Sequence, residues 1–218
     1  LGWELQQLGF DFTYDKRLLE RLADRDASEI TAHLHADLDY QEKLVRFLEN
    51  HDEERAIAAL GKEKSMAAAV VMSTLLGMKF YYDGQFEGKS IRLPVQLGRE
   101  PNEKPRQCIM NFYGKLLQIT KDDIFKNGEW YMLEVLPGWN SDTTFNNMMA
   151  WLWKYRNEKR LVVVNYSGKT AFCRIKLDVR GYPESFRIFD LLNDTVYLRH
   201  AEEVFHHGLF VELQKYKC

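Results

Sequence analysis

A short apolar run that ends in a dense polar cluster is the feature that most limits how this chain can fold. Leu44–Leu48 has the length of a buried strand, and Asn50, His51 and Asp52 follow where that strand would end. Side chains on an extended backbone alternate between faces, so these three share a face only if the chain turns there. A turn at a strand end is where α/β proteins place their chemistry. Spacing alone, however, favours a polar turn in which Asp52 caps the next helix.

The first half of the chain alternates between strand patterns and helix patterns. Apolar and polar residues alternate over residues 9–14, and Leu18, Leu19 and Leu22 then follow helical spacing. The order strand, helices, strand, helix, strand predicts a parallel sheet, and both connections exceed the roughly ten residues that a parallel crossover requires. The expected strands are residues 9–14, 43–49 and 78–82. One expected helix starts at residue 15 or 16, and three more cover residues 26–40, 64–76 and 106–119.

From Glu129 onward the pattern changes to short apolar or alternating runs separated by turn residues. Regular spacing of short strands is typical of an antiparallel sandwich. Two domains are therefore expected, residues 1–124 with parallel strands and residues 128–218 with antiparallel strands. The expected antiparallel strands lie in residues 130–136, 148–155, 161–166, 171–177, 186–191, 195–199 and 208–213.

The polar cluster also resembles a known motif. Phe47–Asp52, with Arg55 following, is similar to the Phe-x-x-Asn-His-Asp motif after the seventh barrel strand in the α-amylase family of glycoside hydrolases. The resemblance implies that Asp52 is one of three catalytic carboxylates and stabilises the transition state. It also implies that His51 and Asn50 bind the sugar, and that Arg55 orients Asp52 or reaches the sugar.

Two further stretches support this resemblance. Gly84–Gly88 resembles the glycine-bounded acidic loop after the eighth barrel strand, and Leu1–Asp24 resembles the sequence after the fifth-strand motif. The loop match is loose, so Glu87 is expected to make a loop hydrogen bond rather than to catalyse. The implied fold is α/β plus all-β: strands six to eight of a (β/α)8 TIM barrel over residues 1–124, then an antiparallel β-sandwich over residues 128–218.

The other two catalytic groups are expected outside this chain. Retaining glycosidases need a nucleophile and a general acid roughly 5 to 5.5 Å apart, and in the α-amylase family these follow the fourth and fifth strands. The chain begins at Leu1 rather than Met, which indicates a processed chain or a fragment. The parent is expected to act on α-glucosidic bonds of α-glucans or oligosaccharides by hydrolysis, transfer or isomerisation. This chain alone is not expected to catalyse.

The composition of the chain excludes some classes of binding partner. The net charge of −2 argues against nucleic-acid binding, and no apolar run is long enough to span a bilayer. The 3 dispersed cysteines predict neither a disulfide framework nor a metal site and leave the compartment open, with the cytoplasm favoured. No cofactor is expected in this chain, and the resemblance leaves calcium open for the parent. The expected partners are the glucan, the missing N-terminal part of the barrel and, through an open barrel face, a second copy of the chain.

Two alternatives to an enzyme fragment remain. One is a non-catalytic interaction subunit with an amylase fold, although such proteins usually lose the site carboxylates and Asp52 is present. The other is a β-sandwich sugar-binding module, which predicts an exposed aromatic platform in residues 129–218. For each of its four candidate tryptophans, the alternative is packing against the barrel. These are Trp130, Trp139, Trp151 and Trp153.

Overall fold

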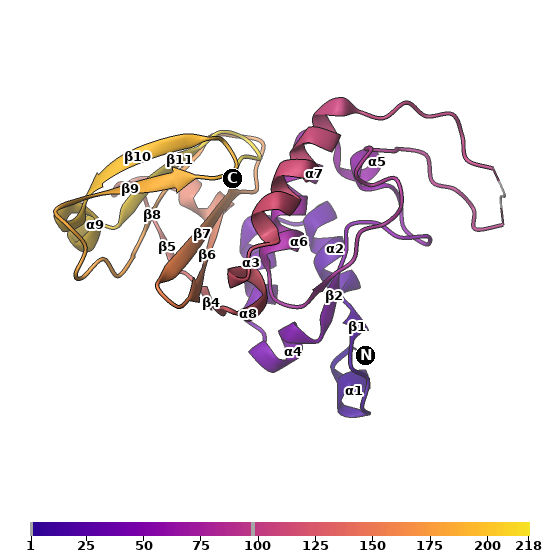
Figure 1. The fold of residues 1–218 in the computed structure, drawn as a ribbon, viewed down its shortest axis with the longest axis horizontal. Coiled ribbons are helices and arrows are strands. Elements are labelled where there is room, and N and C mark those ends of the chain that lie inside the picture. Colours follow the sequence, from indigo (N-terminus) through magenta and orange to yellow (C-terminus); the bar gives the residue numbers. More distant parts are fainter. Residues whose placement is uncertain (1, 97–98) are drawn as a thin grey trace. The chain divides into compact units, whose positions relative to one another are not determined.

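The computed structural model describes residues 2–96 and 99–218, which form two compact units (Figure 1). Unit 1 is Leu1–Lys121 and unit 2 is Asp122–Cys218. The strands described in unit 1 pair in parallel, and those described in unit 2 pair antiparallel. Within the described ranges, no helix has both the length and the apolar composition needed to cross a membrane.

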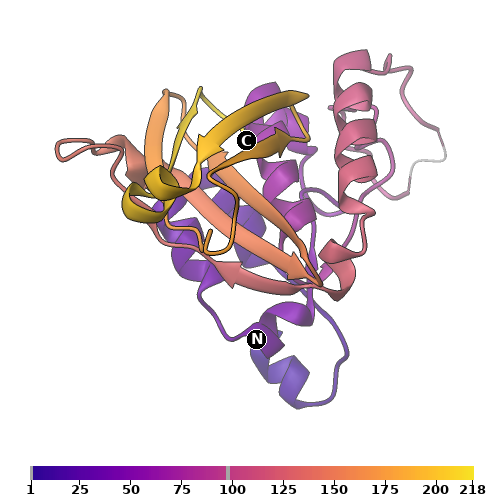
Figure 2. The same ribbon diagram turned by 60° about the vertical axis from the view of Figure 1, so that its left-hand side comes forward.

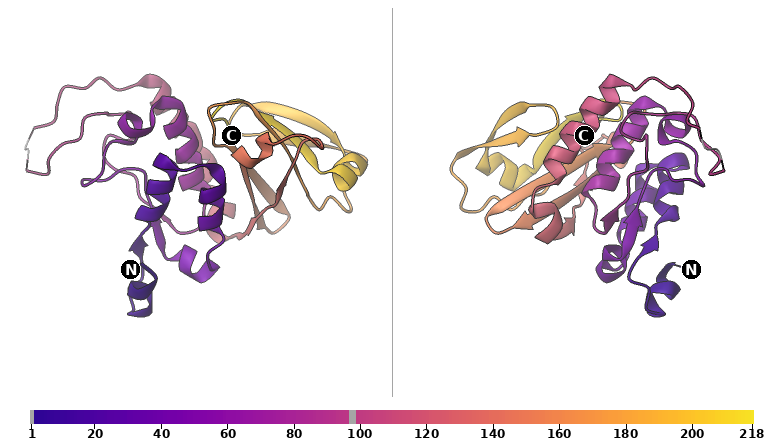
Figure 3. Two further views of the ribbon diagram at one scale, coloured as in Figure 1. Left: turned by 180° about the vertical axis from the view of Figure 1, so that it is seen from behind. Right: turned by 45° about the vertical axis from the view of Figure 1, so that its right-hand side comes forward.

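Unit 1 alternates strands with helices, as the sequence predicts, and Figure 3 places α1 at one end of the unit. Its elements are α1 (Gly2–Gln7), β1 (Thr13–Tyr14), α2 (Lys16–Asp24), α3 (Ala27–Leu34), α4 (Leu38–Glu42), β2 (Leu44–Arg46), α5 (Ala56–Leu60), α6 (Lys62–Thr74), β3 (Met78–Lys79) and α7 (Gln107–Thr120).

The sheet of unit 1 confirms the parallel arrangement. Its order is β1-β2-β3, with Tyr14 opposite Val45 and Val45 opposite Met78. The three strands described do not close into a barrel. The strands are shorter than predicted. At the first strand, the amides of Gly9 and Phe10 bond to carbonyls of α1, so these residues close that helix and do not join the sheet.

The helix predicted over residues 26–40 is two helices. Asp26 caps α3 as the acid-x-x-Glu spacing predicts, because its side chain accepts the N–H groups of Ser28 and Glu29. Asp37 then caps α4 by accepting the N–H groups of Asp39 and Tyr40. Asp37 starts a second helix inside a stretch whose sequence pattern looks continuous. The prediction of one helix over residues 26–40 was wrong for this reason.

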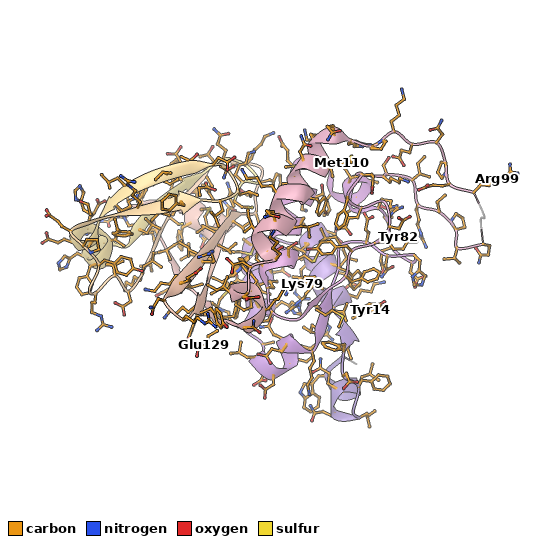
Figure 4. All side chains as sticks on the ribbon, viewed as in Figure 1. Tyr14, Lys79, Tyr82, Arg99, Met110 and Glu129 are labelled. Atoms are coloured by element: carbon orange, nitrogen blue, oxygen red, sulfur yellow. The ribbon has the colours of Figure 1, made fainter. Side chains whose placement is uncertain are left out.

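The two faces of the parallel sheet differ in chemistry. On one face, the Tyr14 ring lies 5.2 Å from that of Phe47 and 6.3 Å from that of Phe80, which stacks on Tyr82. On the other, Arg46 lies opposite Lys79. Figure 4 shows Lys79 on the opposite side of the strands from Tyr14 and Tyr82. Successive side chains on a strand alternate between faces, so this separation follows from the sequence order.

The polar face is organised by a fully buried ion pair between Arg46 and Asp15. Arg46 also donates to Gln41 Oε1 at 2.6 Å and to the Leu76 carbonyl at 3.2 Å. His33 Nε2 lies 3.0 Å from Asp15 Oδ2. Burial raises the pKa of Asp15, but the hydrogen bond with His33 and the charge of Arg46 outweigh it and hold this pKa below its usual value.

Lys79 adds a second cation next to this pair. Its amine donates to the carbonyls of Leu75 and Gly77, both at the end of the α6 segment. Burial, with a smaller contribution from the charge of Arg46, lowers the pKa of Lys79 to about 7. The polar face therefore holds a group that titrates near neutral pH.

Unit 2 consists of small antiparallel sheets, which confirms the predicted pairing, while the sandwich arrangement stays a prediction. Figure 2 brings its strands, drawn in orange to yellow, to the front. Their orders are β4-β6-β7, β11-β8-β5 and β10-β9. The elements are α8 (Ile124–Asn127), β4 (Glu129–Met132), β5 (Val135–Leu136), η1 (Thr144–Asn147), β6 (Met148–Tyr155), β7 (Glu158–Asn165), β8 (Ala171–Ile175), β9 (Ser185–Asp190), β10 (Thr195–His200), α9 (Ala201–His207) and β11 (Leu209–Leu213).

Three of the four tryptophans considered for an aromatic platform belong to the core of unit 2. Trp130, Trp151 and Trp153 are buried, and the Trp153 ring lies 5.8 Å from that of Phe125 in α8. For these three the platform assignment is wrong, while packing against the barrel stays a prediction. Trp139 alone among the four is exposed, at 48%.

Replacing Arg46 should destabilise unit 1 strongly. Arg46→Met keeps much of the side-chain volume but leaves the buried Asp15 carboxylate without its guanidinium, a loss of about 3–5 kcal/mol in the free energy of unfolding. Urea denaturation followed by circular dichroism measures it. The matched control is Arg25→Met, because Arg25 pairs with Glu29 at the surface and should lose less than about 1 kcal/mol. Equal losses in both variants would contradict a central role for the buried pair.

The low pKa of Lys79 predicts a specific pH dependence of stability. The folded chain releases the Lys79 proton near pH 7, whereas an unfolded lysine keeps it to about pH 10.4. Unfolding therefore takes up a proton between these values, so stability should rise with pH across this window. Lys79→Met should flatten that rise. The hydrogen bonds that this variant also loses should lower its stability equally at both pH values and leave the slope unaffected. Urea denaturation at pH 7 and pH 9.5 measures the difference, and Lys43→Met, at an exposed position, should keep the wild-type slope.

Candidate active site at the end of the central strand

Asn50 forms the turn that ends the apolar run after β2. Phe47 and Leu48 are buried, and Asn50 Oδ1 then accepts the N–H groups of Asp52 at 2.8 Å and Glu53 at 3.1 Å. This hydrogen-bonded turn is a usual role of asparagine. The chain therefore turns after the central strand, which is the condition for consecutive residues such as His51 and Asp52 to share one side.

His51 and Asp52 stand at the tip of this turn. The Asp52 side chain is 75% exposed and the His51 side chain 50%, and His51 Nε2 lies 3.3 Å from Asp52 Oδ2. The turn therefore presents one carboxylate and one imidazole to solvent, side by side. Both can form hydrogen bonds to the hydroxyl groups of a bound ligand.

Asp52 does not cap the following helix, so the cap interpretation is wrong. Helix α5 begins at Ala56, with Arg55 at the cap position and no side-chain cap bond. The N–H of Ala56 instead donates to Glu49 Oε2 at 2.6 Å. A more distant carboxylate thus satisfies the helix start and leaves Asp52 out of it.

The hydrogen bonds described for Arg55 go to residues other than Asp52, so a role in orienting Asp52 or reaching the sugar stays a prediction. Its guanidinium is buried and donates to Glu49 Oε1 at 2.7 Å, to the Asp83 carbonyl at 2.6 Å and to the Ile91 carbonyl at 3.3 Å. It also lies over the Tyr82 ring, 4.9 Å from its centroid. Arg55 therefore ties the end of β2 to the segment that follows β3.

Glu49 is the residue that sequence reasoning missed. It is buried. Its Oε1 accepts a hydrogen bond from the Arg55 guanidinium, and its Oε2 accepts one from the N–H of Ala56. Burial raises the pKa of Glu49, although the hydrogen bond from Ala56 and the charge of Arg55 oppose the rise. The available signal was an acid directly after an apolar run, with an arginine close behind it.

The loop after β3 is shaped to receive Arg55. Gly84 has a φ of +82°, and a Cβ at this position would lie 3.0 Å from Arg55 Nη2, so glycine suits both the conformation and the space. Gln85 donates to the Tyr113 hydroxyl at 2.8 Å and fixes the loop to α7. The backbone carbonyl of Glu87 accepts the N–H of Arg106 at 2.9 Å, while a loop hydrogen bond from the Glu87 side chain stays a prediction.

The first strand contributes a charge to the same edge of the sheet. Lys16, which opens α2 directly after β1, pairs with Glu53 in the turn at 2.8 Å. The turn is thus connected to the segments that follow both neighbouring strands. No cluster of three or more His, Cys, Asp or Glu residues suited to a metal ion occurs in the part of the chain that the structure describes.

Searches by sequence found no matching family model and no matching curated protein. Searches by structure found α-amylase-family enzymes. A maltogenic α-amylase from Thermotoga neapolitana aligns with a TM-score of 0.72 and 20% identity, over 95% of this chain and 50% of that chain. An α-amylase from Geobacillus thermoleovorans aligns with a TM-score of 0.74 and 16% identity, over 98% and 48%. The chain has the fold of part of an α-amylase-family enzyme.

The resemblance inferred from the motif is therefore confirmed for the fold, at low sequence identity. A trehalose-6-phosphate hydrolase from Bacillus licheniformis also aligns, with a TM-score of 0.57 and 17% identity, over 86% of this chain and 49% of that chain. The chain thus spans about half the length of each of these three proteins. Two of the three are α-amylases and one is a trehalose-6-phosphate hydrolase, so the fold alone does not select one substrate.

Arg55→Met should loosen the candidate site. It leaves the Glu49 carboxylate buried without its guanidinium, at a cost of about 3–5 kcal/mol. Without Arg55, the buried Glu49 carboxyl should bind a proton more readily, and a neutral carboxyl is less costly to bury. The loss in the free energy of unfolding should therefore be larger at pH 8 than at pH 5. Hydrogen exchange should accelerate at the Ala56 amide and over residues 82–91. Arg92→Met, at an exposed arginine in the same loop, should change neither. Unchanged exchange in Arg55→Met would show that Arg55 does not hold the loop.

Proposed function

We propose that this chain is part of a retaining glycoside hydrolase of the α-amylase type, acting on α-glucosidic bonds of α-glucans or oligosaccharides. The observation that carries the proposal is the position of His51 and Asp52: exposed, adjacent, and at the C-terminal end of the central strand of a parallel sheet. That end is where barrel enzymes place their catalytic residues. The amylase-family fold of the chain supports the same assignment.

In this proposal β1, β2 and β3 are the sixth to eighth barrel strands, within a barrel portion of residues 1–124. Residues 128–218 are the C-terminal β-sandwich domain. The nucleophile and the general acid then belong to the sequence that precedes this chain in the parent enzyme. Asp52 is the third carboxylate, so the chain alone does not catalyse.

Asp52 acts by binding sugar hydroxyls more tightly as the ring approaches the transition state. In glycoside hydrolysis the ring becomes oxocarbenium-like, and hydrogen bonds to its hydroxyls strengthen at that stage. Interactions that strengthen only in the transition state raise kcat. His51 is a second hydroxyl-binding group. Asn50 and Arg55 hold the turn, since Asn50 bonds within it and Arg55 bonds to Glu49.

Exposed apolar side chains of unit 1 fit the same proposal. Phe10, Phe12, Tyr14 and Met78 are each between 45% and 57% exposed. Tyr14 and Met78 flank Val45 on the aromatic face of the sheet. In an intact barrel, the interior face of a sheet is covered by the other strands. We therefore assign the preceding part of the barrel as the partner of this face, and self-association of the isolated chain as the consequence of its absence.

Replacing Asp52 in the parent enzyme tests the proposal. Asp52→Asn keeps the shape but removes the charge, so kcat and kcat/KM should fall together, by about 100-fold or more, with little change in KM. Steady-state kinetics on a soluble α-glucan and a thermal melt measure activity and stability. Asp11→Asn, at an exposed aspartate of the same unit, is the control and should match the wild type. A near-wild-type kcat in Asp52→Asn would remove Asp52 from the mechanism.

A further inference from the structure

Trp139 in unit 2 is an exposed tryptophan that the proposed catalytic role leaves unexplained. It lies in the loop between β5 and η1 and is 48% exposed. The other tryptophans of the unit are at most 6% exposed. Aromatic rings are enriched at binding surfaces relative to the rest of a protein surface.

The Trp139 ring continues a row of aromatic side chains on the sheet β11-β8-β5. Its centroid lies 5.1 Å from that of Phe172 on β8. Phe172 in turn lies 6.3 Å from Phe210 on β11, with the two planes only 24° apart. Both phenylalanines alternate with the core residues Ala171, Cys173 and Leu209, so the row lies on the face of the sheet that points away from that core.

The loop that carries Trp139 is held in place by Asp142. Its carboxylate accepts the N–H of Gly138 at 2.9 Å and that of Thr144 at 2.7 Å, and its own N–H donates to the Trp139 carbonyl at 3.0 Å. Arg174 Nε donates to the Gly138 carbonyl at 3.0 Å. The ring is therefore positioned before any ligand arrives, which reduces the entropy lost on binding.

Gly138 lets this loop lie directly on the aromatic row. A Cβ at residue 138 would be 3.2 Å from Phe172 Cβ and 3.3 Å from Phe210 Cε2. Exposed polar residues adjoin these rings: Asn140 and Ser141 follow Trp139 in the loop, and Glu212 lies opposite Phe172 on β11. Binding sites for neutral polar ligands combine an apolar surface with a few hydrogen-bonding groups in this way.

We propose that Trp139, Phe172 and Phe210 form a second α-glucan-binding surface, located in unit 2 and without a catalytic role. The C–H face of a glucose ring packs on the indole, and the rim of Asn140, Ser141 and Glu212 binds the hydroxyls. The assignment to α-glucans, rather than to another saccharide, rests on the proposed function. The surface itself rests on the aromatic row and its preorganised loop.

Affinity electrophoresis of the 218-residue chain tests this surface. Amylopectin in a native gel should retard the wild-type chain, and Trp139→Ala should raise the dissociation constant at least about tenfold. Trp139→Tyr, which keeps a stacking ring, should retain most of the binding. Two exposed aromatic residues serve as matched controls and should bind like the wild type: Trp3→Ala in unit 1, where Trp3 is 59% exposed, and Phe189→Ala in unit 2, where Phe189 is 61% exposed.

Trp139→Leu separates binding from packing. Leucine still covers Phe172 but offers no ring to stack on, so this variant should melt like the wild type and bind like Trp139→Ala. Equal retardation of wild type and Trp139→Leu, or no retardation of the wild type, would overturn the proposal. Equal retardation by a β-glucan would overturn the assignment to α-glucans. Failure of the Asp52 kinetics leaves these gels unaffected, so the two proposals can fail separately.

Discussion

The buried pair of Asp15 and Arg46 is the interaction on which unit 1 depends. Around it meet the end of β1, the start of α2, helix α3 through His33, helix α4 through Gln41, and the end of the α6 segment through Leu76. Burying two charges is costly, and the cost is offset only when every hydrogen-bonding position is filled. Directional bonds to so many segments therefore specify one arrangement, whereas apolar contacts alone would tolerate several.

A second buried pair extends this order to the candidate site. Glu49 and Arg55 close the loop that contains Asn50, His51 and Asp52, so both ends of the loop are fixed while its tip stays in solvent. The same arginine reaches the backbone of the next loop at Asp83 and Ile91. The exposed residues can thus be held in position without a direct contact from the residues that hold them. Preorganisation of this kind is what a site needs to favour a transition state.

Local patterns in the sequence were sufficient for the parallel order of unit 1, the antiparallel strands of unit 2 and the cap at Asp26. They were insufficient wherever the partner is distant or belongs to the backbone. Arg55 bonds to carbonyls 28 and 36 residues away, and no side-chain pattern indicates such acceptors. Trp153 and Trp139 look alike in the sequence, and only the contact of the Trp153 ring with Phe125 of α8 distinguishes them. The roles proposed for Asp52 and His51 rest on the motif, because their geometry alone fits many ligands.

The uneven distribution of tryptophan has a spectroscopic consequence. Unit 1 contains Trp3 alone, at an exposed site, whereas unit 2 contains the other four of the 5 tryptophans, three of them buried. Burial blue-shifts indole emission, so the change in intrinsic fluorescence on denaturation reports chiefly on the antiparallel unit. Most of the helices lie in unit 1, so the far-ultraviolet signal of helix reports chiefly on the parallel unit. The chain thus carries two built-in reporters, and any gap between their transitions measures how far the units unfold independently.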